Sequence, residues 1–275
     1  MSHAHAEPQA ALVDSGPGRL WAFGYKTYVI AELEVRKLRH DPTELLTRAV
    51  QPALWLLIFG EVFARVRAIP TGGLPYLDFM APGILAQSVL FVAIFSGIAL
   101  IWERDLGVIH KLFVSPTPRA ALVVGKALAA GIRSLSQVVI VYTLAAILGV
   151  HMRWTVTALA GVLFTVLLGA ACFATLSLII ASLVRTRERF MGIGQLLTMP
   201  LFFASNAIYP LAIMPPWLHV VARLNPLSYE VDALRALMIP GGSSAFGIGL
   251  DMTVLAASAA LLVGIAARVY PRVVT

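Results

Sequence analysis

The sequence predicts an all-α, polytopic membrane protein with six transmembrane helices, an N-terminal amphipathic interfacial helix, and a re-entrant helical hairpin between helices five and six. Composition, long uncharged runs and the placement of the cations support this prediction. Of the 275 residues, 59% are hydrophobic and 13% are charged, and the mean hydropathy is +0.84. A soluble domain carries about 25% charged residues, so a bilayer is the expected environment.

Six segments are long and apolar enough to be transmembrane helices. A helix needs about 20 apolar residues to cross about 30 Å of hydrocarbon. The segments lie at about 47–65, 79–102, 127–149, 155–183, 190–210 and 248–268. Residues 1–18 are polar and rich in Pro, Gly and Ala without an apolar run, so we expect a disordered tail and no cleavable signal peptide. Residues 46–275 then form one transmembrane domain.

The cations orient these segments. With a cytoplasmic N-terminus, fifteen of the 21 Lys and Arg residues fall on the cytoplasmic side and five on the other. Cytoplasmic loops carry such an excess, so both termini are predicted to be cytoplasmic in a multi-pass protein of the cell (plasma or inner) membrane. The same bias accounts for the net charge of +7, and nucleic acid is not an expected partner.

Residues 19–45 are predicted to form the amphipathic interfacial helix. Trp21, Tyr25 and Tyr28 lie near one face, and cations such as Lys26 and Arg36 occupy polar positions. Aromatic rings and cations suit the headgroup layer of membrane lipids. Two interpretations stay open: the helix only anchors the first span, or it also contacts a cytoplasmic partner.

A second amphipathic segment lies in the cytoplasmic loop between spans two and three. Leu106, Ile109, Leu112 and Phe113 recur at helical spacing. Prolines at positions 116 and 118 stop the helix, so it covers about 103–115. Such a helix can act as a rigid lever. Its apolar face either packs on the inner ends of the spans or fits a groove of a partner protein.

The uncharged run from Phe190 to Ala222 is too long for one crossing. Prolines are expected to break it, at Pro200, Pro210, Pro215 and Pro216. A short helix follows at Trp217, and Asn225 with Pro226 predicts an N-cap and the first position of a second helix. We expect these two helices to form an outer hairpin at about 211–240 that dips into the outer leaflet.

Catalytic and metal-binding patterns are missing from the sequence. It contains no nucleophile elbow, no zinc-protease motif and no phosphate loop. The single cysteine, Cys172, lies in an apolar run and is expected to be buried. We therefore expect no enzyme activity and no metal site. Glu61 and Asp251 lie close enough to an interface to be solvated, and Arg133 lies in span three, where it either snorkels to the cytoplasm or has a function.

Three stretches make the chain resemble the ABC-2 type transporter permeases, especially the daunorubicin-resistance-like and nodulation-exporter-like branch. The stretch 103–119 has the pattern E-x-x-x-G-x-x-x-x-L-x-x-x-P-x-x-R. The others are Met214-Pro-Pro-Trp-Leu and Asn225-Pro-Leu-Ser-Tyr-Glu-Val-Asp-Ala-Leu-Arg235. With the six-span layout, the resemblance extends over about residues 20–270.

The resemblance implies a half-transporter without an ATPase site of its own. Two permease chains, expected to be a homodimer, would work with two ABC ATPase subunits that bind ATP and Mg, and this chain would bind no cofactor. The helix between spans two and three would dock on the ATPase through Glu103, Arg104, Gly107, His110, Lys111, Leu112, Phe113 and Arg119. The hairpin would close the outer side through Pro215, Pro216, Trp217, Asn225, Pro226, Tyr229, Asp232 and Arg235.

Cargo residues are predicted from their apolar, aromatic or small polar character. The candidates are Gln87 and Ser88 on span two and Phe202, Phe203, Ser205, Asn206 and Tyr209 on span five. They suit export of a hydrophobic or amphipathic cargo such as a drug, a lipid or a lipid-linked glycan. The alternative is an ion-gradient-driven secondary transporter. Its expected mark is a mid-membrane carboxylate relay, for which the sequence offers only the peripheral Glu61 and Asp251.

Overall fold

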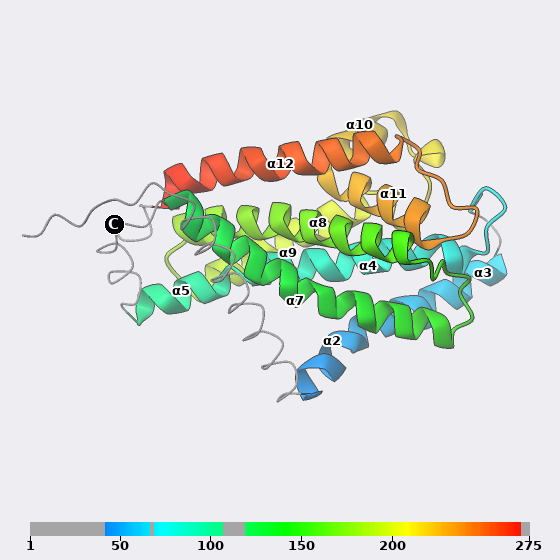
Figure 1. Ribbon diagram of the computed structural model, residues 1–275, viewed down its shortest axis with the longest axis horizontal. Helices are drawn as coiled ribbons and strands as arrows, with labels where there is room; N and C mark the ends of the chain where they lie inside the picture. Colours follow the sequence, from blue (N-terminus) through cyan, green and yellow to red (C-terminus); the bar gives the residue numbers. More distant parts are fainter. Residues whose placement is uncertain (1–41, 67–68, 107–118, 271–275) are drawn as a thin grey trace, which may run out of the picture.

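A computed structural model describes residues 42–66, 69–106 and 119–270, and these residues form helices and loops without strands. The long helices lie side by side in an elongated bundle (Figure 1). One end of the bundle holds α5 (Ile98–Asp105) and the start of α7 (Arg119–Ile147). The other holds α11 (Pro226–Met238). We call these the α5 end and the α11 end.

Four described helices are long and apolar enough to cross a membrane. They are Tyr76–Asp105, Leu122–Ile147, Val156–Leu183 and Ile248–Val269. They correspond to the predicted spans two, three, four and six. The chain is therefore an integral membrane protein by the length and composition of its helices.

The helix that contains predicted span one is interrupted by a π-helical segment. It consists of α2 (Pro42–Leu54), the π-helix η1 (Trp55–Gly60) and α3 (Glu61–Val66). Rings of Trp55, Phe59 and Phe63 stack in sequence along it, with centroids 4.4 and 6.3 Å apart. It is not among the four helices that are long and apolar enough to cross a membrane, so its crossing stays a prediction.

The second span bends where α4 (Tyr76–Phe95) meets α5. The hydroxyl of Ser177 on α8 (Val156–Leu183) accepts the N–H of Gly97 at 3.1 Å and donates to the carbonyl of Ile94. A side chain inserted into the helical hydrogen-bond ladder is a recognised cause of a kink. A Cβ at Gly97 would lie 2.2 Å from that hydroxyl, so glycine is required there.

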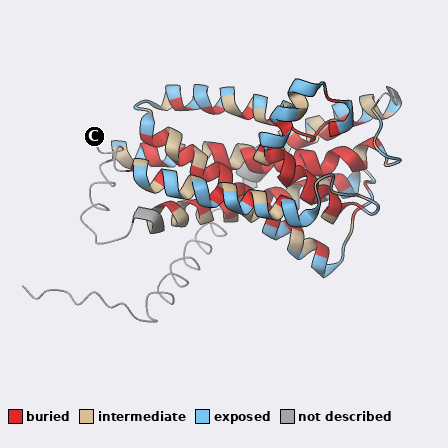
Figure 2. Ribbon diagram, turned by 90° about the horizontal axis from the view of Figure 1, so that it is seen from above, coloured by how far each residue is buried: buried red, intermediate tan, exposed pale blue. Residues whose placement is uncertain are grey.

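Helices α4 and α8 form the centre of the bundle. Their facing side chains, such as Ile84, Val89, Val166 and Phe173, belong to one buried apolar cluster. Buried residues are concentrated in the interior and toward the end of the bundle away from the C-terminus (Figure 2). α7 and α12 (Ile248–Val269) pack on α8, and apolar residues such as Val139 and Leu261 are left exposed on them.

The predicted span five ends earlier than expected. Helix α9 covers Arg187–Phe203, and the chain then turns instead of continuing to residue 210. The prediction that Pro200 breaks the helix is wrong, because Pro200 lies inside α9. The helix ends three residues later, where the Asn225 amide donates to the carbonyls of Leu201 at 2.7 Å and Ala204 at 3.1 Å. Those carbonyls have no partner further along the helix, and a side chain supplies one.

Two short helices follow, as predicted. After a 3-10 turn (Leu211–Ile213) come α10 (Pro216–Leu224) and α11. The side chain of Asn225 accepts the N–H of Leu227 at 3.0 Å, and Pro226 is the first residue of α11. The predicted cap is therefore confirmed. Insertion of the pair into a leaflet stays a prediction.

Some predictions fall outside the described residues. These are the tail at 1–18, the amphipathic helix at 19–45 except for its last four residues, which belong to α2, and residues 107–115 of the loop helix.

Candidate functional site

The first candidate site is a group of ion pairs at the α5 end. Glu103 on α5 accepts hydrogen bonds from Lys126 of α7, whose Nζ lies 2.7 and 2.6 Å from the two carboxylate oxygens. Both side chains are partly exposed. The pair joins the helix before residues 107–118 to the helix after them.

The next residues of α5 contact the link between α8 and α9. Asp105 pairs with Arg187 at 2.8 Å, and the Arg187 guanidinium lies 3.5 Å from the ring centroid of Trp102. Arg104 donates to the carbonyls of Val184, at 3.1 Å, and Arg185. We call Trp102, Glu103, Arg104, Asp105, Lys126 and Arg187 the α5 cluster. A single exposed pair contributes about 0–1 kcal/mol, but a connected network does more.

The structure places two of the eight predicted ATPase-docking residues in this cluster, Glu103 and Arg104. Gly107, His110, Lys111, Leu112 and Phe113 lie outside the described residues, and Arg119 begins α7 with its side chain outside them. Sequence reasoning did not identify the roles of Trp102, Lys126 and Arg187. The excess of basic residues in the neighbouring loops was visible, but the sequence does not show which cation meets which carboxylate.

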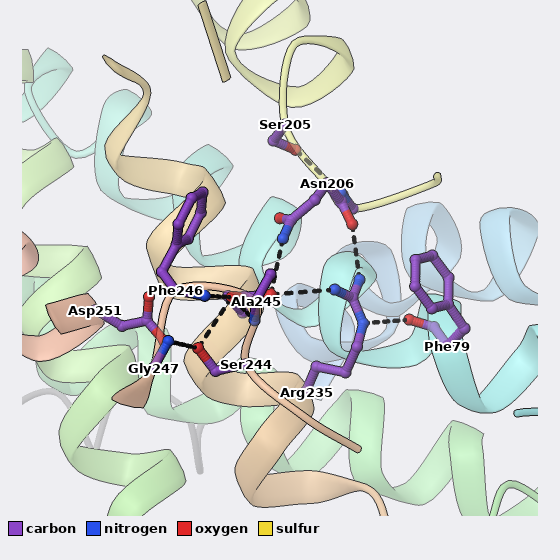
Figure 3. Close-up of polar contacts among 11 residues, drawn as sticks. Phe79, Ser205, Asn206, Arg235, Ser244, Ala245, Phe246, Gly247 and Asp251 are labelled. Atoms are coloured by element: carbon purple, nitrogen blue, oxygen red, sulfur yellow. Dashed lines mark hydrogen bonds and ion pairs between the residues drawn. The ribbon is translucent and has the colours of Figure 1, made fainter. Parts of the chain in front are cut away.

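The second candidate site is a buried polar network at the α11 end, which we call the α11 network (Figure 3). Asp232 and Arg235 lie 3.6 Å apart as an ion pair, and both are almost fully buried. The Asn206 amide donates to Asp232 at 2.9 Å, while Arg235 donates to the Asn206 carbonyl at 2.7 Å and to the Phe79 carbonyl at 3.3 Å. The network therefore ties α11 to α4 and to the turn after α9.

The other oxygen of Asp232 fastens the loop that leads into α12. It accepts the N–H groups of Ala245 and of Phe246, the latter at 3.1 Å. The Ser244 hydroxyl lies 3.0 Å from this oxygen and 2.7 Å from Oδ2 of Asp251 on α12. One hydroxyl proton serves one acceptor at a time, so Ser244 links two acidic side chains with a single donor. Asp251, expected to be solvated, is in fact buried.

Arg235 stays charged in this setting. Burial lowers the pKa of its guanidinium to about 10, and the neighbouring Asp232 opposes that shift. Its Cζ atom also lies 3.9 Å from the ring centroid of Phe79. The cation has a carboxylate, two carbonyls and a ring face as partners, which satisfies a buried guanidinium.

The remaining hairpin residues are placed as follows. Pro215 precedes α10, Pro216 is its first residue, and Trp217 next to them is exposed. Tyr229 donates its hydroxyl to the carbonyl of Arg223 at 2.6 Å and stacks on Phe246. α10 and α11 are thereby held to each other and to the loop before α12.

Five of the seven cargo candidates are buried within the chain. Of these, Ser88 donates to Ile84, and Ser205 to the carbonyl of Phe202. Phe203 is exposed and Tyr209 partly exposed. The cargo role of the set, Gln87, Ser88, Phe202, Phe203, Ser205, Asn206 and Tyr209, stays a prediction.

The buried acids of the α11 end were largely missed. Besides Asp232 and Asp251, the structure buries Asp78 on α4, whose Oδ2 lies 3.0 Å from Nδ1 of His151, and Glu230 on α11. Glu230 resembled an ordinary polar position in sequence, because the alternation of polar and apolar residues does not show which polar side of a short helix is covered.

Comparison with known proteins decides the family. The family model described as "ABC-2 type transporter" matches residues 25–239. The chain belongs to the ABC-2 type transporter family.

Proteins similar to this ABC-2 chain occur in several organisms. A putative transport permease ycf38 of Cyanophora paradoxa is 29% identical over 217 residues, which cover 78% of this chain and 74% of the relative. The daunorubicin resistance ABC transporter permease protein DrrB1 of Streptomyces coeruleorubidus is 24% identical, over 84% and 81%. Nodulation protein J of Rhizobium leguminosarum bv. trifolii is 25% identical, over 71% and 74%.

Family membership fixes the general role of the chain. An ABC-2 chain is the membrane subunit of an ABC transporter, and it works with a separate ABC ATPase partner. The resemblance in residues 103–119 and 214–235 is thus confirmed at the level of the family.

Proposed function

We propose that the chain is the permease of an ABC exporter, which moves a hydrophobic or amphipathic cargo out of the cytoplasm. In this proposal two copies of the chain form the pathway, and two ATPase subunits bind ATP and Mg on the cytoplasmic side. The helix α2–η1–α3 and α9 complete six spans, both termini are cytoplasmic, and the α11 end faces outward in the cell membrane.

The α5 cluster carries the proposal. Residues 107–118 lie between α5 and α7, and the Glu103–Lys126 pair joins these two helices. The Asp105–Arg187 pair joins the same place to α9. A partner that pushes on residues 107–118 would therefore move three helices together. This is how a separate ATPase can drive a permease that has no ATP site.

Charge supports the proposed orientation. Arg104, Lys126 and Arg187 lie at the α5 end, together with Arg185 in the link between α8 and α9 and Arg189 in the first turn of α9. Cations gather on the cytoplasmic side of membrane proteins, and the ATPase binds there. The α11 end then faces outward, where α10 and α11 cover the ends of the spans.

The cargo class is supported by apolar surface and by the relatives. Large apolar side chains are exposed on α2, η1 and α3, among them Leu54, Leu57, Ile58 and Phe59, and Phe203 follows on α9. The relative from Streptomyces is named for daunorubicin resistance. An amphipathic cargo fits such an apolar surface better than an ion does.

The test is transport by the purified complex in sealed inside-out proteoliposomes, with daunorubicin as the fluorescent probe. The complex contains the chain and its partner ABC ATPase. We expect accumulation that requires ATP and Mg and persists when proton and sodium gradients are collapsed. Accumulation driven by an imposed ion gradient without ATP would overturn the proposal in favour of a secondary transporter.

A further inference from the structure

Glu230 is a buried acid that has no hydrogen-bond partner among the described residues. It lies in the middle of α11 with 0% of its surface exposed. Among the described residues, neither carboxylate oxygen has a hydrogen-bond partner. An ionised carboxylate in such a place loses its hydration without compensation, which costs far more than burying the neutral acid. The other acids buried at this end, Asp78, Asp232 and Asp251, each have a hydrogen bond.

The carboxyl group occupies a socket on α8 made by a glycine. A Cβ built on Gly169 would lie 2.3 Å from the carboxyl carbon of Glu230 and 2.4 Å from both oxygens. The acid therefore lies directly against the backbone of α8. The carboxyl group fills the space beside Gly169 only while α11 is packed on α8.

No cation of α11 reaches this side of the helix. At about 100° per residue, Glu230 points about 160° away from Asp232 and about 140° away from Arg235, which pair with each other. α8 carries no charged residue, and its titratable group is Cys172. The charged or titratable groups of the other packed elements are Tyr76 and Asp78 on α4, Asp251 and Arg268 on α12, and His219 and Arg223 on α10.

The neutral form is therefore favoured while α11 is packed. Burial raises the pKa of Glu230 well above its ordinary value, and desolvation is the cause. In a state where α11 separates from α8, water reaches the carboxyl group and its pKa returns toward that of an exposed glutamate, about 4.3.

We propose that Glu230 is a proton-binding site that latches the α11 end: it holds a proton while α11 is packed on α8 and releases it when α11 separates. The inference rests on the proposed function in one respect, that the α11 end opens outward during transport. The proton regulates this opening, and ATP drives it.

The sign of the effect follows from linkage. The packed state has the raised pKa, so its advantage is complete below the pKa of an exposed glutamate and is lost as pH rises toward the raised value. Alkaline conditions therefore favour separation of α11 from α8. The equilibrium shifts by at most about tenfold per pH unit, because one proton is involved.

Labelling of the chain's own cysteine can measure this separation. Cys172, the only cysteine, lies three residues after Gly169 on α8 and is fully buried. Residues three apart share a helix face. A small thiol reagent therefore reaches Cys172 when α11 moves away.

The experiment measures the rate at which N-ethylmaleimide labels Cys172 in the full chain, in lipid nanodiscs, between pH 5.5 and 8.5. Thiolate formation accelerates labelling in every variant, so the rate is divided by that of Glu230→Gln, which imitates the protonated acid at every pH. We expect the ratio to increase at least several-fold between pH 5.5 and 8.5, by at most about tenfold per pH unit. Glu61→Gln, which removes an exposed acid, should behave as the wild type.

A ratio that stays constant across the range overturns the proton site. The proton site is also overturned if the labelling rate of Cys172 keeps its pH dependence in Glu230→Gln and loses it in Asp251→Asn. If Glu230→Gln does not fold, the wild-type rate is divided instead by that of an exposed cysteine at position 243 (Ser243→Cys) in the same chain. A quotient of these two rates that stays constant with pH then overturns the proton site.

Labelling without the ATPase separates this inference from the proposed function. A changing ratio together with absent ATP-dependent transport leaves the proton site standing and refutes the exporter. A constant ratio with normal ATP-dependent transport refutes the proton site and leaves the exporter standing.

Discussion

At the scale of single residues, the α11 end is held by side chains that each serve several elements. Arg235 is the clearest case, with partners on α11, α4 and the turn after α9. A lysine has no planar fork to donate to the carbonyls of Phe79 and Asn206 at once. The buried carboxylate of Asp232 depends on the same guanidinium for its charge balance.

Removing one member of this buried pair is expected to be costly. Asp232→Ala leaves a buried cation without its carboxylate and frees the N–H groups of Ala245 and Phe246. We expect a loss of about 3–5 kcal/mol in the free energy of unfolding, measured by chemical denaturation in detergent. Arg223→Ala, at an exposed position of α10, should change it by about 0.5 kcal/mol or less. Equal effects of the two substitutions would refute the network's structural role.

Sequence reasoning missed the burial of Glu230 for a physical reason. Glu230 sits at a polar position of one short helix, and the pattern of polar and apolar residues does not show which polar positions are covered. In the structure α11 is surrounded by α4, α8 and α12, so its polar side chains are buried as well. Burial on all sides depends on how distant segments pack, and helical periodicity records only the helix itself.

At the scale of helices, Asn225 joins two of them. Its Oδ1 accepts the first free N–H of α11, and its Nδ2 donates to the last carbonyls of α9. The cap on α11 was predictable, because Asn before Pro at a helix start satisfies a known geometry. The cap on α9 was not predictable, because Leu201 and Asn225 are 24 positions apart.

Two substitutions separate these roles. Asn225→Asp keeps the acceptor for α11 and loses the donor to α9, whereas Asn225→Ala loses both. We expect Asn225→Ala to lower the free energy of unfolding by about 2–4 kcal/mol, from a lost cap and two orphaned carbonyls. Asn225→Asp should cost about half as much. Thermal unfolding in detergent measures both, and an aspartate variant as unstable as the alanine variant would show that only the α9 contact matters.

The spans show how much of the fold can be predicted from periodicity and composition. Four predicted spans match helices with the required length and composition, within a few residues at most ends. The predicted span five extended to residue 210, although Pro200 was expected to break the run. The helix tolerates Pro200 and ends where the Asn225 side chain takes over its carbonyls. A helix end of this kind is set by a tertiary contact.

At the scale of the whole molecule, the two candidate sites lie at opposite ends of the bundle (Figure 1). α4 with α5, α7, α8 and α12 extend between them, so a movement at the α5 cluster has a continuous helical path to the α11 network. The orientation of this axis in the membrane is the part that cysteine labelling tests.

Ser243→Cys and Glu188→Cys place thiols at exposed positions near the α11 end and the α5 end, respectively. In intact cells, an impermeant maleimide should label the cysteine at position 243 and spare the one at 188, which reacts only after permeabilisation. The wild-type chain is the control, because its Cys172 is buried. Labelling of position 188 from outside would invert the proposed topology.

The central claim is that the α5 cluster transmits the work of the ATPase, and charge reversal at its best-paired contact tests this most directly. The measurement is ATP-dependent daunorubicin transport per ATP hydrolysed by the reconstituted complex, for Glu103→Lys, Lys126→Glu and the double variant. Each single reversal sets like charges about 3 Å apart and should reduce the transport-to-hydrolysis ratio by at least about tenfold. The double variant should recover most of it, and Glu188→Gln should match the wild type. Normal coupling in both single variants, or no recovery in the double variant, would contradict the account.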